Sequence, residues 1–454
     1  MSPSPPRSPA LCAATPAPST AARPLTRPGA ASHDADAPAV RLLNDILIHA
    51  AARNASDLHF ERGAHDWRIR LRIDGVLHLA DPVPSHLRDP LIARIKALAG
   101  LDIAERRLPQ DGRLSLRLCA DRSEDFRVST LPTVHGEKVV LRRLDTLPAL
   151  FDFGMLGYDA GQQAALYAAL HAPHGMILVT GPTGSGKTLS LFGFLNAIND
   201  PSINICTVED PVELRLPGIT QVSVREKAGL DFASVLRAFL RQDPDVMMVG
   251  EIRDAATADI AVKAAQTGHR VLSTLHTNDA SSAIIRLRDI GIASYKLAAA
   301  LRLVTAQRLV RKLCPQCREP DPLAIAQCAV MGSAAMAAFS PAPPPGVRPM
   351  PARSRPACAT TVHDPAGGDL PPAWRAVGCD ACHGIGYRGR MAIHEVMPIS
   401  ARMRELIVGD ASVVALSAQA RAECIPTLQD AALAAVRAGR TSLAEAFGAT
   451  GSDA

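Results

Sequence analysis

A glycine-rich segment that ends in Lys-Thr offers the clearest chemistry in this sequence. It reads GPTGSGKT, with four residues between Gly181 and Gly186-Lys187-Thr188. Glycines let the backbone wrap around phosphates with its N–H groups pointing inward, lysine reaches the terminal phosphates, and the threonine hydroxyl can ligate Mg²⁺. An apolar run precedes the segment and helix-forming residues follow it, as in a phosphate-binding loop between strand and helix. We predict that the nucleotide is bound by Gly181, Pro182, Thr183, Gly184, Ser185, Gly186, Lys187 and Thr188.

Hydrolysis would also need carboxylates, to hold Mg²⁺ and to position the attacking water. Candidates stand where two strand-like apolar runs end: Glu209 and Asp210 follow NICTV, and Glu251 follows VMMVG. Each of them could instead cap a helix or face solvent. Two histidines, His269 and His276, flank a further apolar run. They could contact the terminal phosphate, connect it to a neighbouring subunit, or serve only in packing.

Four cysteines form two Cys-x-x-Cys pairs, Cys314 with Cys317 and Cys379 with Cys382. Four thiolates suit tetrahedral Zn²⁺, and such a closed site is structural because it leaves no position for water. The pairs lie far apart in the sequence, so buried thiols without a metal are the alternative. Ten cysteines in 454 residues do not resemble a secreted disulfide framework, which indicates a reducing cytoplasm.

The elements that must position these residues fall into successive segments of different composition. In the centre, buried strand-like runs alternate with helical segments, which predicts a doubly wound α/β nucleotide-binding domain. Before it, WRIRLRIDGVLHL alternates apolar and polar residues like a half-buried strand with a turn at Asp74-Gly75. The predicted segments are a disordered Pro/Ala-rich arm (1–39), a smaller α+β domain (40–148), the nucleotide-binding core (149–312), a cysteine-bearing module (313–398) with a flexible insertion (about 319–373), and a helical C-terminal region (399–454).

The composition argues against several classes of function. The net charge is +5, from 49 Lys and Arg against 44 Asp and Glu, but the basic residues are spread along the chain. We therefore do not expect a dedicated nucleic-acid surface. Neither a secretory signal nor a membrane span is recognisable, so any membrane association is expected to be peripheral.

Four motifs in a fixed order carry a resemblance to a known family: GPTGSGKT, TVEDPVE, LRQDPDVMMVGEIRD and AAQTGHRVLSTLHTNDA. They resemble the ATPases that power type II secretion and type IV pilus assembly, over about residues 56–441. The resemblance implies a RecA-like P-loop ATPase that uses ATP and Mg²⁺. It implies Glu209, in the aspartate box, as the carboxylate that positions the water, and Glu251, in the Walker B segment, as an organiser of Mg²⁺. Functional roles for His269 and His276 are implied by their match to the histidine box.

Further segments resemble the second N-terminal domain of this family, whose arginines face nucleotide across a hexamer interface. They are SDLHFE, LDIAERRLPQDGR and DFRVSTLPTVHGEKVVLR. A guanidinium stabilises the charge of a phosphoryl transition state, although most arginines in a protein are simply solvated. By this resemblance, Arg127 and Arg142 are the first candidates for the role, with Arg113 behind them, and a homohexamer is implied.

Members of the family that drive assembly carry a tetracysteine module with a shorter loop, whereas retraction motors lack it. The sequence therefore resembles an assembly motor, with structural Zn²⁺ held by the four cysteines. Two features depart from the family pattern. One is the long Pro/Ala-rich insertion. The other is the N-terminus, where we expect a disordered arm of about forty residues and not the domain with which family members commonly dock on a membrane-anchored cytoplasmic partner.

Together with these motifs, the resemblance implies a cytoplasmic, Mg²⁺-dependent ATPase motor, a homohexamer at the inner membrane. Through an inner-membrane platform protein and other components of the apparatus, it would drive pilin or pseudopilin subunits into a fibre. One alternative is a related traffic ATPase for DNA uptake or conjugation, and another is a nucleotide-gated scaffold without useful turnover. The intact loop and the two carboxylates argue against the scaffold. Because the motifs are shared, they do not separate pilus assembly from type II secretion.

Overall fold

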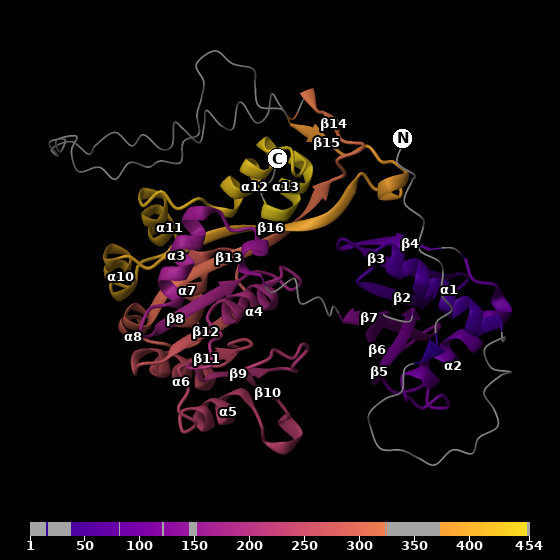
Figure 1. The fold of residues 1–454 in the computed structure, drawn as a ribbon, viewed down its shortest axis with the longest axis horizontal. Helices are drawn as coiled ribbons and strands as arrows, with labels where there is room; N and C mark the ends of the chain where they lie inside the picture. Colours follow the sequence, from indigo (N-terminus) through magenta and orange to yellow (C-terminus); the bar gives the residue numbers. More distant parts are fainter. Residues whose placement is uncertain are drawn as a thin grey trace, which may run out of the picture. The chain divides into compact units, whose positions relative to one another are not determined.

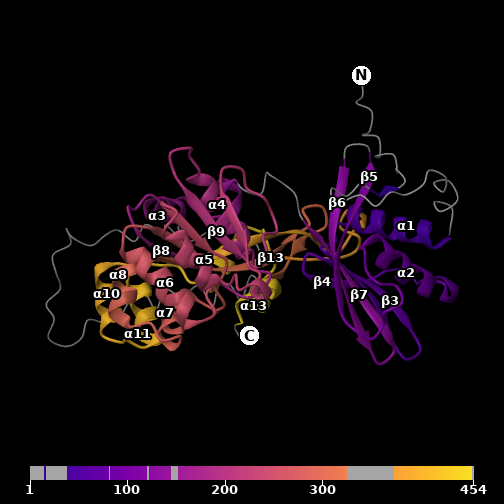
Figure 2. The same ribbon diagram turned by 90° about the horizontal axis from the view of Figure 1, so that it is seen from below.

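The computed structural model divides the chain into two compact units, Met1–Leu147 and Pro148–Ala454 (Figures 1 and 2). Within the described residues, each unit builds a sheet of its own. The predicted arm and the predicted insertion lie mostly outside these residues, so their structure stays a prediction. The described residues are 15–16, 38–80, 82–119, 122–144, 152–322, 324 and 373–451.

The first unit is an antiparallel sheet with two helices, α1 (Pro38–Ala52) and α2 (Arg88–Leu98), on one side of it (Figure 2). The strands, in sheet order, are β1 (Thr15–Pro16), β5 (Gln110–Cys119), β6 (Arg122–Thr133), β7 (Gly136–Leu144), β2 (Asp57–Arg62), β3 (Trp67–Ile73) and β4 (Val76–Leu79). Along β3, buried apolar residues alternate with more exposed arginines, as the sequence pattern predicts. Alternate side chains of a strand point to opposite faces, so one face of this sheet packs on the core.

The second unit is a mainly parallel sheet with helices on both faces. In sheet order its strands are β10 (Thr220–Ser223), β9 (Ile205–Glu209), β11 (Val246–Val249), β12 (Arg270–Leu275), β8 (Gly175–Thr180), β13 (Leu301–Leu313) and β16 (Tyr387–Pro398), of which only β16 runs antiparallel to its neighbour. Met176 and Leu178 of β8 pack into one apolar cluster, whereas Ile177 and Val179 pack into another. Both faces of the sheet are therefore covered, which confirms the predicted doubly wound α/β class.

Each face has its own set of helices. The cluster that contains Ile177 is covered by α3 (Ala160–Leu170) and α4 (Lys187–Ala197). The opposite face is covered by α5 (Phe232–Phe239), α6 (Ala255–Gln266), α7 (Ala280–Asp289) and α8 (Ser294–Ala300). Short 3-10 turns are η2 (Ser85–Leu87) in the first unit, and η4 (Phe153–Leu156), η5 (Glu226–Ala228) and η6 (Asp380–Cys382) in the second.

The C-terminal part of the second unit is helical, as predicted. It contains α10 (Ala401–Val408), α11 (Val413–Ala422), α12 (Leu428–Arg437) and α13 (Leu443–Thr450). Each helix begins after a residue whose hydroxyl accepts a hydrogen bond from a backbone N–H three residues further on, namely Ser400, Ser412, Thr427 and Ser442. These caps satisfy N–H groups that have no partner within the helix, and so divide the segment into four helices.

The cysteine pairs lie at the two ends of the predicted insertion, beside the short strands β14 (Glu319–Pro320) and β15 (Trp374–Arg375). These two strands pair with each other in antiparallel fashion. Among the helices that the structure describes, none has the length and apolar character needed to cross a membrane.

Candidate active site

The phosphate loop connects β8 to α4 and adopts a shape that requires glycine. Gly181, Gly184 and Gly186 have φ angles of 150°, 79° and 88°. A Cβ atom on Gly181 would lie 2.5 Å from the backbone oxygen of Gln307, closer than a carbon can approach. The helix α4 begins directly after the loop, at Lys187, so its positive N-terminal end lies beside the loop. A backbone of this kind suits a phosphate group.

Three predicted residues meet beside this loop. The ammonium of Lys187 donates hydrogen bonds to the backbone oxygens of Gly181, at 2.7 Å, and Pro182, at 3.0 Å. It also lies 3.5 Å from Nδ1 of His276. The other ring nitrogen of His276 lies 3.2 Å from Oε2 of Glu251. The histidine therefore bridges the lysine of the loop and the Walker B carboxylate.

The environment fixes the charges of this group. Burial lowers the pKa of Lys187 to about 8, although the nearby charge of Glu251 opposes this effect. Burial also disfavours ionisation of Glu251, but hydrogen bonds and charge from Arg253 and His276 outweigh it and lower its pKa. Arg253 forms an ion pair with Oε1 of Glu251. Glu251 is thus held as an ionised carboxylate, the form that can ligate Mg²⁺.

Glu209 emerges at the same edge of the sheet as Glu251, because β9 and β11 are neighbouring parallel strands. Its Oε1 accepts hydrogen bonds from Oγ1 of Thr207, at 2.6 Å, and from Nε2 of Gln221, at 3.0 Å. Burial raises the pKa of Glu209, and these hydrogen bonds oppose the rise. A carboxylate with a raised pKa at the carboxyl end of parallel strands is well suited to orient a water molecule.

His269 lies at the opposite end of β12 from His276. The strand between them has six residues and spans about 20 Å. Nδ1 of His269 lies 3.1 Å from the backbone oxygen of Ala264, in the last turn of α6. Within this unit, the structure therefore does not bring His269 to the phosphate loop, and its functional role stays a prediction.

The three predicted arginines form a row in the first unit. Arg113, Arg127 and Arg142 stand directly opposite one another on β5, β6 and β7. Residues paired in this way point to the same face of an antiparallel sheet. Nε of Arg142 donates a hydrogen bond of 2.8 Å to Asp57 on the next strand, β2. Burial disfavours the ionised form of Asp57. Hydrogen bonds from Arg142 and Ser56, together with the charges of Arg142 and Arg72, outweigh this effect and lower the pKa of Asp57.

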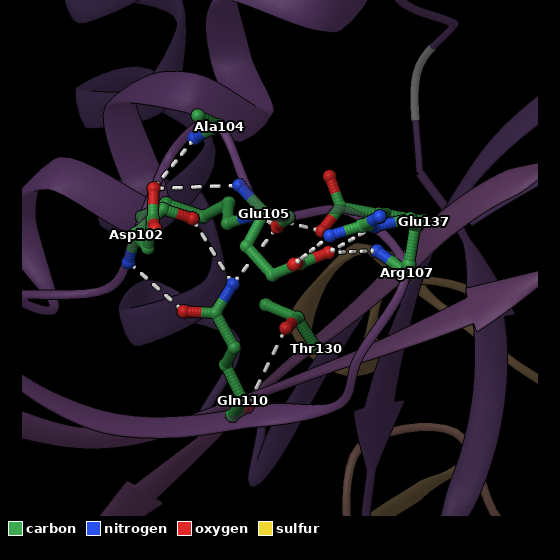
Figure 3. A network of polar contacts seen from close by, with 8 residues as sticks. Asp102, Ala104, Glu105, Arg107, Gln110, Thr130 and Glu137 are labelled. Atoms are coloured by element: carbon green, nitrogen blue, oxygen red, sulfur yellow. Dashed lines mark hydrogen bonds and ion pairs between the residues drawn. The ribbon is translucent and has the colours of Figure 1, made fainter.

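A network of polar contacts stabilises the conformation of the segment that leads into β5 (Figure 3). The ammonium of Lys96, whose side chain is 1% exposed, lies 2.7 Å from both the backbone oxygen of Glu105 and Oε1 of Glu137. The amide of Gln110 exchanges hydrogen bonds with the backbone of Asp102. These contacts fix the start of β5, the strand that carries the first arginine of the row.

The four cysteines come together, as their pairing in the sequence predicts. Their sulfur atoms all lie within 4.8 Å of one another. Sγ distances are 3.9 Å for Cys314 and Cys379, 3.8 Å for Cys317 and Cys382, and 3.7 Å for Cys379 and Cys382. Zn–S bonds of about 2.3 Å in a tetrahedron require sulfur atoms about 3.8 Å apart. The cluster therefore has the dimensions of a structural zinc site.

Three polar residues at the site were not identified from the sequence, namely Gln221, Arg253 and Gln307. Nε2 of Gln307 donates to the backbone oxygen of Ser185, at 2.7 Å, and its Oε1 accepts from Ser190, at 2.6 Å. A polar amide in the mostly apolar run LRLVTAQRLV is a usable signal, because a buried amide needs hydrogen-bond partners. Gln221 had no comparable signal.

A family model described as "Type II/IV secretion system protein" matches residues 32–448. The chain belongs to this family. Membership confirms the resemblance that the four motifs indicate. A relative from Acinetobacter baylyi, "Type IV pilus assembly ATPase PilB", is 44% identical over 90% of this chain and 66% of its own length. A relative from Vibrio cholerae, "Type II secretion system ATPase E", is 43% identical over 91% of this chain and 76% of its own length.

Two solved structures share the fold of this chain. The ATPase DotB of Legionella pneumophila aligns with a TM-score of 0.62 at 18% identity, over 89% of this chain and 94% of its own. The pilus retraction motor PilT with bound ADP aligns with a TM-score of 0.55 at 23% identity, over 89% and 95%. At these identities the likeness concerns the fold, and it supports the predicted RecA-like ATPase class.

Proposed function

We propose that this family member is an ATP-hydrolysing motor that powers assembly of a type IV pilus or of a type II secretion pseudopilus. The contact of Lys187, His276 and Glu251 carries the proposal, because it joins a phosphate-binding loop to an ionised carboxylate suited to Mg²⁺. The names of relatives that are 43–44% identical supply the biological role. The chain spans 66% of the length of the PilB relative from Acinetobacter baylyi.

Each residue of the site has a separate role in this proposal. The loop glycines and the N-terminus of α4 would hold the phosphates, while Lys187 would place its charge at the terminal phosphate. Thr188, in the first turn of α4, and Glu251 would hold Mg²⁺, which neutralises phosphate charge when bound. Glu209 would orient the attacking water, and His276 would link the lysine to Glu251 as the phosphate changes.

The arginine row completes the proposed mechanism. Arg127 and Arg142, with Arg113 beside them, would stabilise transition-state charge on nucleotide bound by a neighbouring copy of the chain, in a homohexamer. Movements between the two units would be passed on to an inner-membrane platform protein. We propose that the motor works on the cytoplasmic side, peripherally at the inner membrane, and we do not propose a role for nucleic acid.

The proposal is tested by measuring Mg²⁺-dependent ATP turnover against protein concentration. We expect turnover per chain to rise cooperatively with assembly, because an arginine supplied by a neighbour acts only in the oligomer. Arg127→Ala should bind ATP normally yet lose about a hundredfold or more in turnover. Arg68→Ala is the matched control, since Arg68 is 50% exposed on β3 and pairs with Asp66. Turnover that is independent of concentration, or normal in Arg127→Ala, contradicts the trans-arginine mechanism.

We further propose that the cysteine cluster binds one structural Zn²⁺ per chain. Cys314→Ser should abolish stoichiometric zinc and lower the unfolding temperature, because metal binding supplies folding free energy. The backbone N–H of Cys314 also bonds to Gly386, one residue before β16, so this strand should loosen first. Metal analysis and thermal unfolding, with Cys206→Ser as the control, test the site. Purified wild-type protein without zinc, and insensitive to chelators, would count against it.

A further inference from the structure

Gln221, on the edge strand β10, is fixed in one orientation by its contacts. Its Oε1 accepts the backbone N–H of Leu216, at 2.7 Å, and its Nε2 donates to the backbone oxygen of Leu214, at 3.0 Å. An amide has one acceptor end and one donor end. Because the backbone of the loop between β9 and β10 occupies both, the amide cannot be turned around. The remaining N–H must therefore point at Oε1 of Glu209, 3.0 Å away.

Both hydrogen bonds to the carboxylate of Glu209 reach the same oxygen. Oγ1 of Thr207 donates to Oε1 at 2.6 Å, and Gln221 donates to Oε1 at 3.0 Å. Among the residues that the structure describes, no donor contacts Oε2. One edge of the carboxylate is thus anchored, and the other oxygen is available for a water molecule.

We propose that Gln221 is a positioning residue for ATP hydrolysis, which orients the carboxylate of Glu209 and favours its ionised form. This inference rests on the proposed role of Glu209 in positioning the water. The same amide holds the loop that carries Leu214 and Leu216, so the state of this loop is coupled to the carboxylate. Hydrogen bonds stabilise the charged form of a carboxylate, so their loss raises its pKa.

The groups around Glu209 make the effect of the Gln221 hydrogen bond on the pKa of Glu209 measurable. Burial raises the pKa of Glu209, and the negative charge of Glu213 raises it further. Against these effects, the described structure provides the hydrogen bonds from Thr207 and Gln221, which lower it. Removing one of the two should shift the acidic limb of the turnover–pH profile towards higher pH, because Glu209 would be protonated there.

The experiment compares turnover of ATP by the full chain between pH 5.5 and 9 for four variants. Gln221→Met removes the donor at similar volume. Thr207→Val removes the other donor without touching the loop. Gln221→Glu keeps an acceptor for Leu216 but turns a carboxylate towards Glu209. The fourth variant, Glu209→Gln, reports on the proposed function itself.

We expect Gln221→Met to lower kcat about tenfold, to leave the KM for ATP within about twofold, and to move the acidic limb up by about one pH unit. Thr207→Val should move it in the same direction, and Gln221→Glu should move it furthest. A residue that only holds the loop would change stability without moving the pH profile. An unmoved profile in both Gln221 variants therefore overturns the inference.

The experiment distinguishes failure of the proposed role of Glu209 from failure of the inference on Gln221. If Glu209→Gln hydrolyses ATP normally, Glu209 does not position the water, and the proposed role fails together with the inference. If Glu209→Gln is inactive while Gln221→Met and Gln221→Glu keep the wild-type profile, the role of Glu209 stands and only the inference on Gln221 is lost.

Discussion

Glu251→Gln should leave ATP bound and almost unhydrolysed. The substitution preserves the volume of the side chain and leaves the phosphate loop intact, so ATP affinity should change by less than about threefold. It removes the charge that Arg253 and His276 hold in place and that Mg²⁺ requires. Since metal-assisted stabilisation contributes several kcal/mol to phosphoryl transfer, we expect turnover to fall by at least about a hundredfold. Steady-state turnover and equilibrium binding of a labelled nucleotide measure the two quantities.

A matched control separates this effect from a general loss of acidic ion pairs. Glu405, on α10, also pairs with a nearby arginine, Arg402, and its side chain is 64% exposed. Glu405→Gln should therefore keep wild-type turnover and affinity. Turnover near the wild-type rate in Glu251→Gln would show that this carboxylate does not organise the metal. Parallel loss of ATP binding would point instead to collapse of the loop.

The parts of the site that could be predicted from the sequence follow either from a local motif or from the topology of the parallel sheet. The phosphate loop follows from glycine spacing between a strand and a helix. The meeting of Lys187, His276 and Glu251 follows from topology, because residues at the carboxyl ends of parallel strands share one edge of the sheet. The fold class was predictable for the same reason, since apolar runs and helices alternate along the chain.

Contacts between distant segments could not be predicted where neither a local motif nor the sheet topology indicates them. The hydrogen bond of Gln307 to Ser185 joins residues that are 122 positions apart. The amide in a mostly apolar run indicates that Gln307 needs a partner, but the sequence does not show which residue that partner is. The two histidines also show that position in the sequence does not decide which residue reaches the site. His269 and His276 flank one strand symmetrically in the sequence, but only His276 reaches the loop, because a strand carries its two ends about 20 Å apart.

The arginine row illustrates how register adds information. The resemblance indicates Arg113, Arg127 and Arg142, and spacing alone does not show that they are adjacent. Two hairpins with specific registers bring them into one line across β5, β6 and β7. Three guanidinium groups in a line repel one another, and Asp57 offsets part of this charge at one end. Guanidinium groups gathered on one face of a sheet suit an anionic ligand such as nucleotide.

Lys187→Ala should weaken ATP binding strongly and reduce turnover still further. The ammonium now donates to the backbone oxygens of Gly181 and Pro182, and burial lowers its pKa to about 8. A phosphate would offer a negative partner that restores the charged form. A hydrogen bond between charged groups contributes about 1.5–3 kcal/mol, so ATP affinity should fall roughly ten- to a hundredfold. Turnover should fall further, because the lysine also acts in the transition state.

The measurement is equilibrium binding of ATP beside turnover, at pH 7 and at pH 9. Because the lysine of the free protein loses its proton above about pH 8, wild-type affinity should weaken between these values, and the affinity of Lys187→Ala should not. Lys263→Ala is the control, since Lys263 is 60% exposed on α6 and pairs with Asp259. Unchanged ATP affinity and turnover in Lys187→Ala would refute the assignment of the phosphate loop. If that assignment is refuted, the roles proposed for Glu251, His276 and Glu209 also fail, because they depend on a nucleotide bound at the loop.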